Sequence, residues 1–190
     1  METFSEDIRN ACEALKGGGL VLYPTDTIWG IGCDATDEQA VKRVYELKKR
    51  TDSKAMIVLL DAPAKLERYV EEVPEMAYDI VELSDNPITI IYPEGKNLAA
   101  GLLAENKSIA IRITREIFSK TLCETFRKPV VSTSANISGE PSPRSFSDIS
   151  DEIKNGVDYI VQYGQTDTAP KKPSSILQLN LDNTVKIIRI

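Results

Sequence analysis

A loop rich in hydroxyl and amide side chains follows a short apolar segment in the last third of the chain. Val130 and Val131 are β-branched and predict a buried strand, and the polar loop then runs to Ser142. Its hydroxyls and backbone N–H groups suit a phosphate or a carboxylate at the carboxyl end of a strand in an α/β sheet. Taken alone, the same residue types also fit an ordinary turn.

Basic residues form a second group that could meet an anion. Lys48, Lys49 and Arg50 follow one another at the end of a predicted helix. Lys54 adds a further cation just before the next predicted strand. Cations in the last turn of a helix also complement the helix dipole, so this cluster has a structural explanation as well.

A strand with alternating residue types supplies a third group. Ile109, Ile111 and Ile113 share one face of this strand, which leaves Arg112 on the other face beside small and polar residues. Such a face could receive an anion. The alternative is an arginine that points into water from an edge strand.

The absence of histidine limits the chemistry that these groups can perform. It excludes the most common general base, the usual catalytic triads and most transition-metal sites. In a chain of net charge -6, basic residues beside hydroxyl-rich turns favour a small polyanionic ligand over a long nucleic acid. The residues alone therefore predict a small-molecule enzyme that handles phosphates or carboxylates, with no stable nucleic-acid binding.

The elements that must position these groups alternate between helices and strands. Helical patterns are expected at 5–16, 37–47, 63–70, 74–83, 116–127 and 148–155, and strands at 20–23, 28–32, 55–60, 87–92, 108–114, from 130, 157–161, 174–179 and 185–190. This alternation predicts an α/β fold with a mixed sheet. With 190 residues, 42% of them hydrophobic, we expect a single domain over 1–190.

The sequence also indicates the cellular compartment of the protein. Cys12, Cys33 and Cys123 are too far apart to suggest a disulfide framework or a zinc knuckle. The longest apolar run, 55–60, cannot span a bilayer, and the first residues lack the features of a signal peptide. We therefore expect a cytoplasmic protein without a membrane partner.

Four spaced motifs carry a resemblance to a known family. They are YPTDTIWGIGCDA at 23–35, the pair Lys48 and Arg50, SIAIR at 108–112 and STSANISGEPS at 132–142. In this order they closely resemble the YrdC family of threonylcarbamoyl-AMP synthases. The resemblance implies a YrdC-like twisted mixed sheet flanked by helices, with a concave, positively lined cavity. It also implies that L-threonine, bicarbonate and ATP are converted into threonylcarbamoyl-AMP and pyrophosphate.

The resemblance further implies roles for individual residues. Contacts to threonine are implied for Thr27, Arg112, Ser132 and Ser174. Contacts to ATP are implied for Lys48, Arg50, Lys54, Ser108, Ser134, Asn136, Ser142 and Arg189, with Lys48, Arg50, Ser134 and Asn136 as the catalytic set. No metal held by the protein is implied, and Mg²⁺ would accompany the triphosphate. The implied partner is a downstream tRNA threonylcarbamoyltransferase.

The sequence departs from the family pattern at a few positions. Trp29 stands where tyrosine is usual, Thr51 where proline is common, and Leu59 where some members have histidine. Two alternative functions stay open at this point. One is a module that binds double-stranded RNA or tRNA, and the other is a related carbamoyl-handling enzyme with a different acceptor.

Overall fold

The computed structural model describes residues 2–50, 56–169 and 171–190. Within these ranges nine strands form one sheet in the order β7-β1-β2-β6-β3-β5-β4-β8-β9. The strands are β1 (Val21–Tyr23), β2 (Gly30–Gly32), β3 (Ile57–Leu60), β4 (Ile88–Tyr92), β5 (Ile109–Ile113), β6 (Val130–Ser134), β7 (Tyr159–Ile160), β8 (Ser175–Leu179) and β9 (Val185–Arg189). Three neighbouring pairs are parallel, β1 with β7, β3 with β5 and β4 with β8, and the other pairs are antiparallel. The predicted mixed sheet is therefore confirmed.

Six helices lie in the described ranges, and α2, α5 and α6 begin at a capping side chain. They are α1 (Glu2–Lys16), α2 (Glu38–Leu47), α3 (Leu66–Tyr69), α4 (Met76–Leu83), α5 (Ile117–Phe126) and α6 (Asp151–Gly156), with 3-10 turns η1 (Pro63–Lys65), η2 (Ala100–Leu102) and η3 (Phe146–Asp148). The side chains of Asp37, Glu116 and Ser150 accept backbone N–H groups in the first turns of α2, α5 and α6. The helix expected from Ser5 begins earlier, and the one expected at 63–70 is a 3-10 turn followed by a single helical turn.

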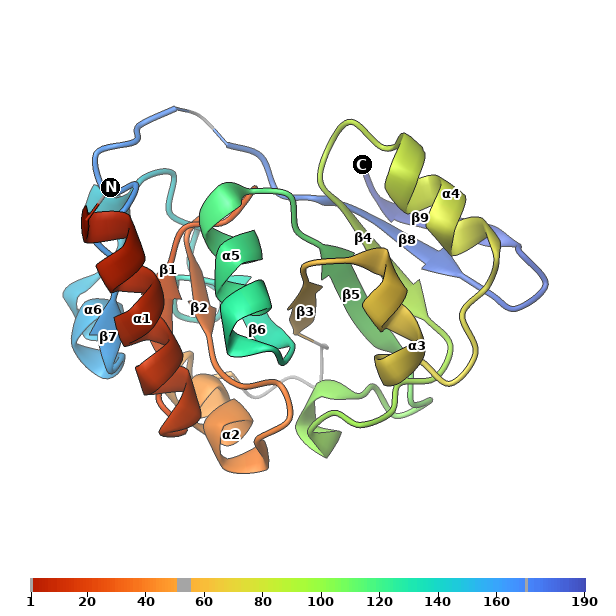
Figure 1. Ribbon diagram of the computed structural model, residues 1–190, viewed down its shortest axis with the longest axis horizontal. Coiled ribbons are helices and arrows are strands. Elements are labelled where there is room, and N and C mark those ends of the chain that lie inside the picture. The colour runs from red at the N-terminus through yellow and green to blue at the C-terminus, as the bar shows by residue number, and fades with distance from the viewer. Residues whose placement is uncertain (1, 51–55, 170) are drawn as a thin grey trace.

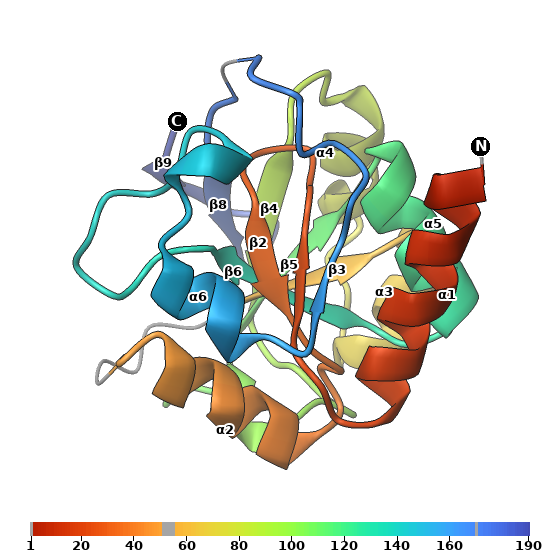
Figure 2. The same ribbon diagram turned by 90° about the vertical axis from the view of Figure 1, so that its left-hand side faces the viewer.

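The helices cover both faces of the twisted sheet. Figure 2 shows α1 on one side of β1 and β2, and α2 with α6 on the other. The smaller hydrophobic cluster packs α1 and α5 against β1, β3 and β6, and includes Leu15, Phe118 and Leu59. The larger cluster joins α2, α3, α4 and α6 to the sheet and includes Val44 and Ile111. Figure 1 shows α1 and α5 side by side, with α3 and α4 toward the other end of the sheet.

A glycine allows the first strands to pack closely. A Cβ atom added at Gly32 would lie 2.6 Å from the ring of Tyr23 and 2.6 Å from the carbonyl oxygen of Val131. The Tyr23 hydroxyl donates to that same carbonyl at 2.9 Å. Only a residue without a side chain fits here, which explains one glycine of the GIG segment.

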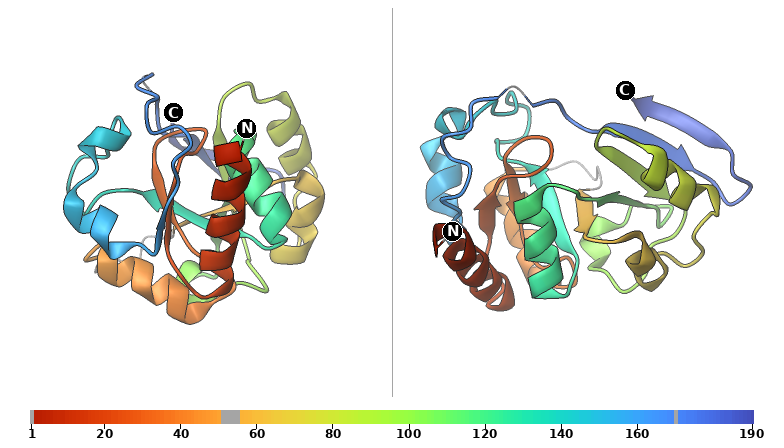
Figure 3. Two further views of the ribbon diagram at one scale, coloured as in Figure 1. Left: turned by 60° about the vertical axis from the view of Figure 1, so that its left-hand side comes forward. Right: turned by 45° about the horizontal axis from the view of Figure 1, so that its top comes forward.

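Between β7 and β8, residues 161–169 and 171–174 run along the top of the molecule in the view of Figure 1. The start of this segment is fixed by the buried carboxylate of Asp7, which accepts the Tyr159 hydroxyl at 2.6 Å and the Tyr163 N–H at 2.7 Å. Figure 3 shows that this route ends at β8 and β9, which form the edge of the sheet farthest from α1. None of the helices in the described ranges is long and apolar enough to cross a membrane.

Candidate functional site

A cavity of about 560 Å³ lies against the sheet and collects most of the side chains singled out from the sequence. Those that line it are Thr27, Arg50, Ser108, Arg112, Ser132, Ser134, Ser142, Ser174 and Arg189. Three arginines line the cavity, and no acidic residue of the described ranges does. Its volume falls within the usual range for small-molecule sites.

The register of the central strands places these residues on one face of the sheet. Ile57 of β3 pairs with Ala110 of β5 and with Ser132 of β6, and all three line the cavity. Arg112 lies two residues beyond Ala110, so it shares that face. The site therefore extends over the sheet face and is not confined to the strand ends where we expected it.

Arg112 is a buried residue of a central strand. Strand β5 lies between β3 and β4, and Arg112 is 2% exposed, which excludes the edge-strand alternative. Its Nη2 atom lies 3.0 Å from Oδ1 of Asp26, but the geometry is not that of a hydrogen bond, and Arg112 Nε also lacks a hydrogen-bond partner. The buried guanidinium thus keeps donor capacity for a ligand.

Asp26 belongs to the polar turn of Thr25, Asp26 and Thr27, and it is a functional candidate for which the sequence predicted no individual role. Burial raises the pKa of its carboxyl group, whereas the positive charge of Arg112 opposes this shift. The contact with Arg112 favours the ionised form. Nothing in the local pattern TDT distinguishes this aspartate from an ordinary turn residue, because its partner lies on a distant strand.

Hydrogen bonds in the turn before β2 determine what Thr27 can offer a ligand. The Thr25 hydroxyl donates to the carbonyl oxygen of Ile28 at 2.8 Å. Its oxygen lies 3.0 Å from the Thr27 hydroxyl, and since its own proton is already used, Thr27 must be the donor in that contact. The Thr27 oxygen, which lines the cavity, is then left as an acceptor.

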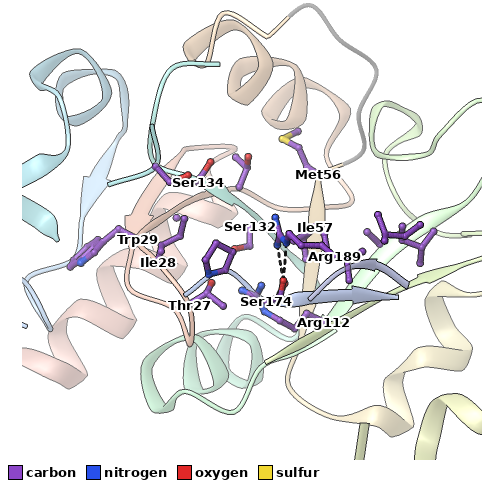
Figure 4. A pocket seen from close by; sticks show the side chains of 18 of the residues that line it. Thr27, Ile28, Trp29, Met56, Ile57, Arg112, Ser132, Ser134, Ser174 and Arg189 are labelled. Atoms are coloured by element: carbon purple, nitrogen blue, oxygen red, sulfur yellow. Dashed lines mark hydrogen bonds between the residues drawn. The ribbon is translucent and has the colours of Figure 1, made fainter. Parts of the chain in front are cut away.

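Ser174, just before β8, and Arg189, the last residue of β9, also line the cavity. Arg189 donates from Nε at 3.0 Å and from Nη2 at 2.8 Å to the carbonyl oxygen of Ser174. The hydroxyl of Ser174 is 2.8 Å from that of Thr89, and both residues are buried. Burial lowers the pKa of Arg189, and the nearby charge of Arg112 lowers it further. Figure 4 shows Thr27, Ser132, Arg189 and Ser174 gathered around Arg112.

Lys48 and Asn136 do not line the cavity. The Lys48 ammonium donates to the carbonyl oxygens of Ser134 and, at 2.6 Å, of Asn136, while the Ser138 N–H donates to the Lys48 carbonyl at 2.8 Å. Burial, and to a smaller extent the charge of Arg50, lowers the pKa of Lys48 to about 8. In this structure Lys48 therefore holds the polar loop from behind, where the sequence led us to expect a phosphate contact.

The Asn136 side chain also forms hydrogen bonds within the polar loop. Its amide nitrogen donates to the carbonyl oxygens of Ile137 and Glu140, both at 2.9 Å, and its buried Oδ1 atom has no hydrogen-bond partner. The loop is therefore fixed from within. Lys54 and Thr51 lie outside the described residues.

Apolar side chains line the rest of the cavity. Ile28 and Trp29 lie at one end, and Met56 and Ile57 lie along it (Figure 4). The Trp29 ring is also packed on Phe146, with ring centroids 4.9 Å apart. Beyond the strand alternation, no local signal marked these residues as part of a site.

Comparisons with known proteins give the family. The model of the Sua5/YciO/YrdC family, described as "Telomere recombination", matches residues 13–190. A relative from Pseudoalteromonas translucida, named threonylcarbamoyl-AMP synthase, is 35% identical and is aligned over 81% of this chain and 84% of its own. The crystal structure of E. coli YciO has a TM-score of 0.82 at 25% identity, covering 96% of this chain and 87% of that one.

A second solved structure bears on the site. It is P. abyssi Sua5 complexed with L-threonine, with a TM-score of 0.81 at 28% identity over 90% of this chain. The match covers 50% of that archaeal protein, so this chain spans about half its length. By sequence and by fold, the chain belongs to the Sua5/YciO/YrdC family.

Proposed function

We propose that this chain is a nucleotidyltransferase that makes threonylcarbamoyl-AMP from L-threonine, bicarbonate and ATP, with release of pyrophosphate. The observation that carries the proposal is that three arginines from distant segments, Arg50, Arg112 and Arg189, face one cavity lined with serine hydroxyls. Such a cavity can hold a carboxylate and a triphosphate together. The synthase name of the P. translucida relative and the threonine in P. abyssi Sua5 support it.

The reaction needs two bond-forming steps. The amine of threonine first attacks bicarbonate, and a water molecule leaves as the N–C bond of the carbamate forms. A carbamate oxygen then attacks the α-phosphorus of ATP, and the bond to the pyrophosphate oxygen breaks. Neither step requires a protein nucleophile, so the site contributes positioning and charge neutralisation.

In this proposal different residues of the cavity take these tasks. Arg112, whose Nε has no hydrogen-bond partner, lines the cavity together with Thr27 and Ser174, and we propose that it binds the threonine carboxylate. Arg50, Ser108, Ser134, Ser142 and Arg189 would face the nucleotide, where Arg50 and Arg189 neutralise phosphate charge. Lys48 and Asn136 would act on ATP through the loop that they hold.

The residues present do not fit a magnesium ion held by the protein. Hydroxyls and guanidinium groups line the cavity, whereas Mg²⁺ prefers carboxylate and other oxygen ligands. No cluster of three acidic or other metal-binding side chains occurs in the part of the chain that the structure describes. In this proposal Mg²⁺ enters with ATP as part of the substrate.

The proposed product requires a second enzyme. A tRNA threonylcarbamoyltransferase would move the threonylcarbamoyl group onto tRNA, and the cytoplasm is the compartment that we propose for both. Three free and buried cysteines, Cys12, Cys33 and Cys123, are consistent with a reducing compartment.

The test is release of pyrophosphate measured with and without each co-substrate. We expect release only when threonine and bicarbonate are both present, and near-complete loss in Arg50→Ala. The matched control is Arg9→Ala, since Arg9 is an exposed arginine of α1 that forms an ion pair with Glu6 at 3.6 Å. ATP turnover that ignores both co-substrates would refute the proposal. Turnover with another amine in place of threonine would favour the alternative carbamoyl-handling enzyme.

A further inference from the structure

The turn of Thr25, Asp26 and Thr27 contributes one residue, Thr27, to the cavity wall. Asp26 lines a second cavity of about 180 Å³ and acts on the first through its contact with Arg112. The remaining polar groups of the wall are hydroxyls and guanidinium groups, which can all donate hydrogen bonds. The Thr27 oxygen is restricted to accepting, because its proton is used by Thr25. Asp26 adds a negative charge directly beside Arg112. This turn therefore suits a ligand group that is positively charged and donates hydrogen bonds.

The position of Asp26 is fixed by its surroundings. Its side chain is 11% exposed, and the turn is held by the Thr25 hydroxyl and by Lys171, whose ammonium lies 3.4 Å from the Thr25 carbonyl oxygen. Two further charges act on Asp26: Glu116 raises the pKa of its carboxyl group, and Lys171 lowers it. A fixed, poorly solvated charge acts on a nearby ligand more strongly than a surface charge does.

A carboxylate bound to Arg112 would feel this charge as repulsion. An α-amino acid carries an ammonium one carbon away from its carboxylate, and attraction of that ammonium offsets the repulsion. A simple carboxylic acid has no such compensation. Thr27 and Arg112 line the same cavity and are both labelled in Figure 4, so an ammonium next to the bound carboxylate could reach Thr27 of this turn.

We propose that Asp26 makes the amino-acid end of the cavity selective for zwitterions, favouring a ligand with an α-ammonium and a carboxylate over one with a carboxylate alone. The inference rests on the proposed function, because it assumes that an amino acid binds at Arg112. It adds a specificity-determining residue that acts by its charge.

The test is direct binding, which needs neither ATP nor turnover. Calorimetry would compare L-threonine with 2,3-dihydroxybutyrate, in which a hydroxyl replaces the amine, on the wild-type protein and on Asp26→Asn. We expect the preference for threonine to fall by about tenfold in Asp26→Asn, since a nearby unit charge has this order of effect on a bound cation. Asp26→Glu should restore much of the preference.

The controls separate charge from folding. Asp79→Asn makes the same change on an exposed position of α4 that lines no cavity described here, and it should keep the wild-type ratio. If Asp26→Asn weakens both ligands equally, or leaves the ratio unchanged, the selectivity inference is wrong and Asp26 has only a structural role. If the wild-type protein binds no threonine, the proposed function itself fails, and the inference fails with it.

Discussion

Replacing Lys48 by methionine tests whether a buried ammonium holds the polar loop of the site. The substitution keeps the length of the side chain but removes the donor to the carbonyl oxygens of Ser134 and Asn136. Each carbonyl left without a partner costs about 1–3 kcal/mol. Against this, the shift of the Lys48 pKa from 10.5 to about 8 means that burying its charge costs about 3 kcal/mol, which methionine avoids. The net loss of stability near neutral pH is therefore at most about 3 kcal/mol.

The pH dependence makes this prediction sharper. The unfolded chain keeps the Lys48 proton up to its ordinary pKa of 10.5, whereas the folded protein loses it near 8. Between these values the unfolded chain binds more protons, so the wild-type protein gains stability as the pH rises. Lys48→Met lacks this gain. The difference in unfolding free energy between the two should widen by about 2–3 kcal/mol from about pH 7 to about pH 10.

Urea unfolding at a series of pH values measures this difference, because the other titrating groups cancel between the two proteins. Lys42→Met is the control, since Lys42 is an exposed residue of the same helix with only a 3.8 Å ion pair to Glu46. Pyrophosphate release should fall in Lys48→Met, and amide exchange of residues 134–142 should accelerate. A difference that stays flat with pH would show that the ammonium is not desolvated, and the account of Lys48 would be wrong.

Four further predictions concern single residues. Arg112→Lys should raise the KM for threonine at least about tenfold and leave the KM for ATP unchanged, because an ammonium cannot present two parallel N–H donors; equal changes in both would contradict this. Gly32→Ala should cost about 1–3 kcal/mol in urea unfolding, since its Cβ would lie 2.6 Å from Tyr23 and from Val131. Gly139→Ala, with φ +88 but open space, should cost only about 1 kcal/mol. Asp7→Asn should lower stability by about 2 kcal/mol, because Asp7 accepts the Tyr159 hydroxyl and the Tyr163 N–H; an unchanged unfolding midpoint would refute this role.

Much of the site was predictable where local periodicity fixes the direction of a side chain. The alternation of Ile109, Ile111 and Ile113 assigns Arg112 to the opposite face, and the structure confirms this. The start of α2 was likewise readable from Asp37. These features depend only on neighbours within a few residues. Helix α6 instead begins at Asp151, after the cap Ser150, although we expected a helix from 148.

What was not predictable depends on the order of strands in the sheet. Asp26 meets Arg112 only because the turn before β2 and strand β5 reach the same cavity, and no local pattern encodes that. The Lys48 side chain points toward the loop after β6, where it donates to the Asn136 carbonyl oxygen, and no local pattern encodes this contact either. The family motifs named the candidate residues, but they did not indicate which side chains line the cavity and which, like Lys48, hold the loop behind it.

In the proposed function, substrate affinity depends on whether the hairpin of β8 and β9 stays paired at the edge of the sheet. Ser174 immediately precedes β8, and Arg189 ends β9, so both leave the cavity if the hairpin detaches. Edge strands fray more readily than central ones, and such opening leaves the rest of the fold intact. A bound substrate that contacts Arg189 would then stabilise the paired hairpin. Protection of the hairpin amides from exchange would therefore increase as the cavity fills with substrate.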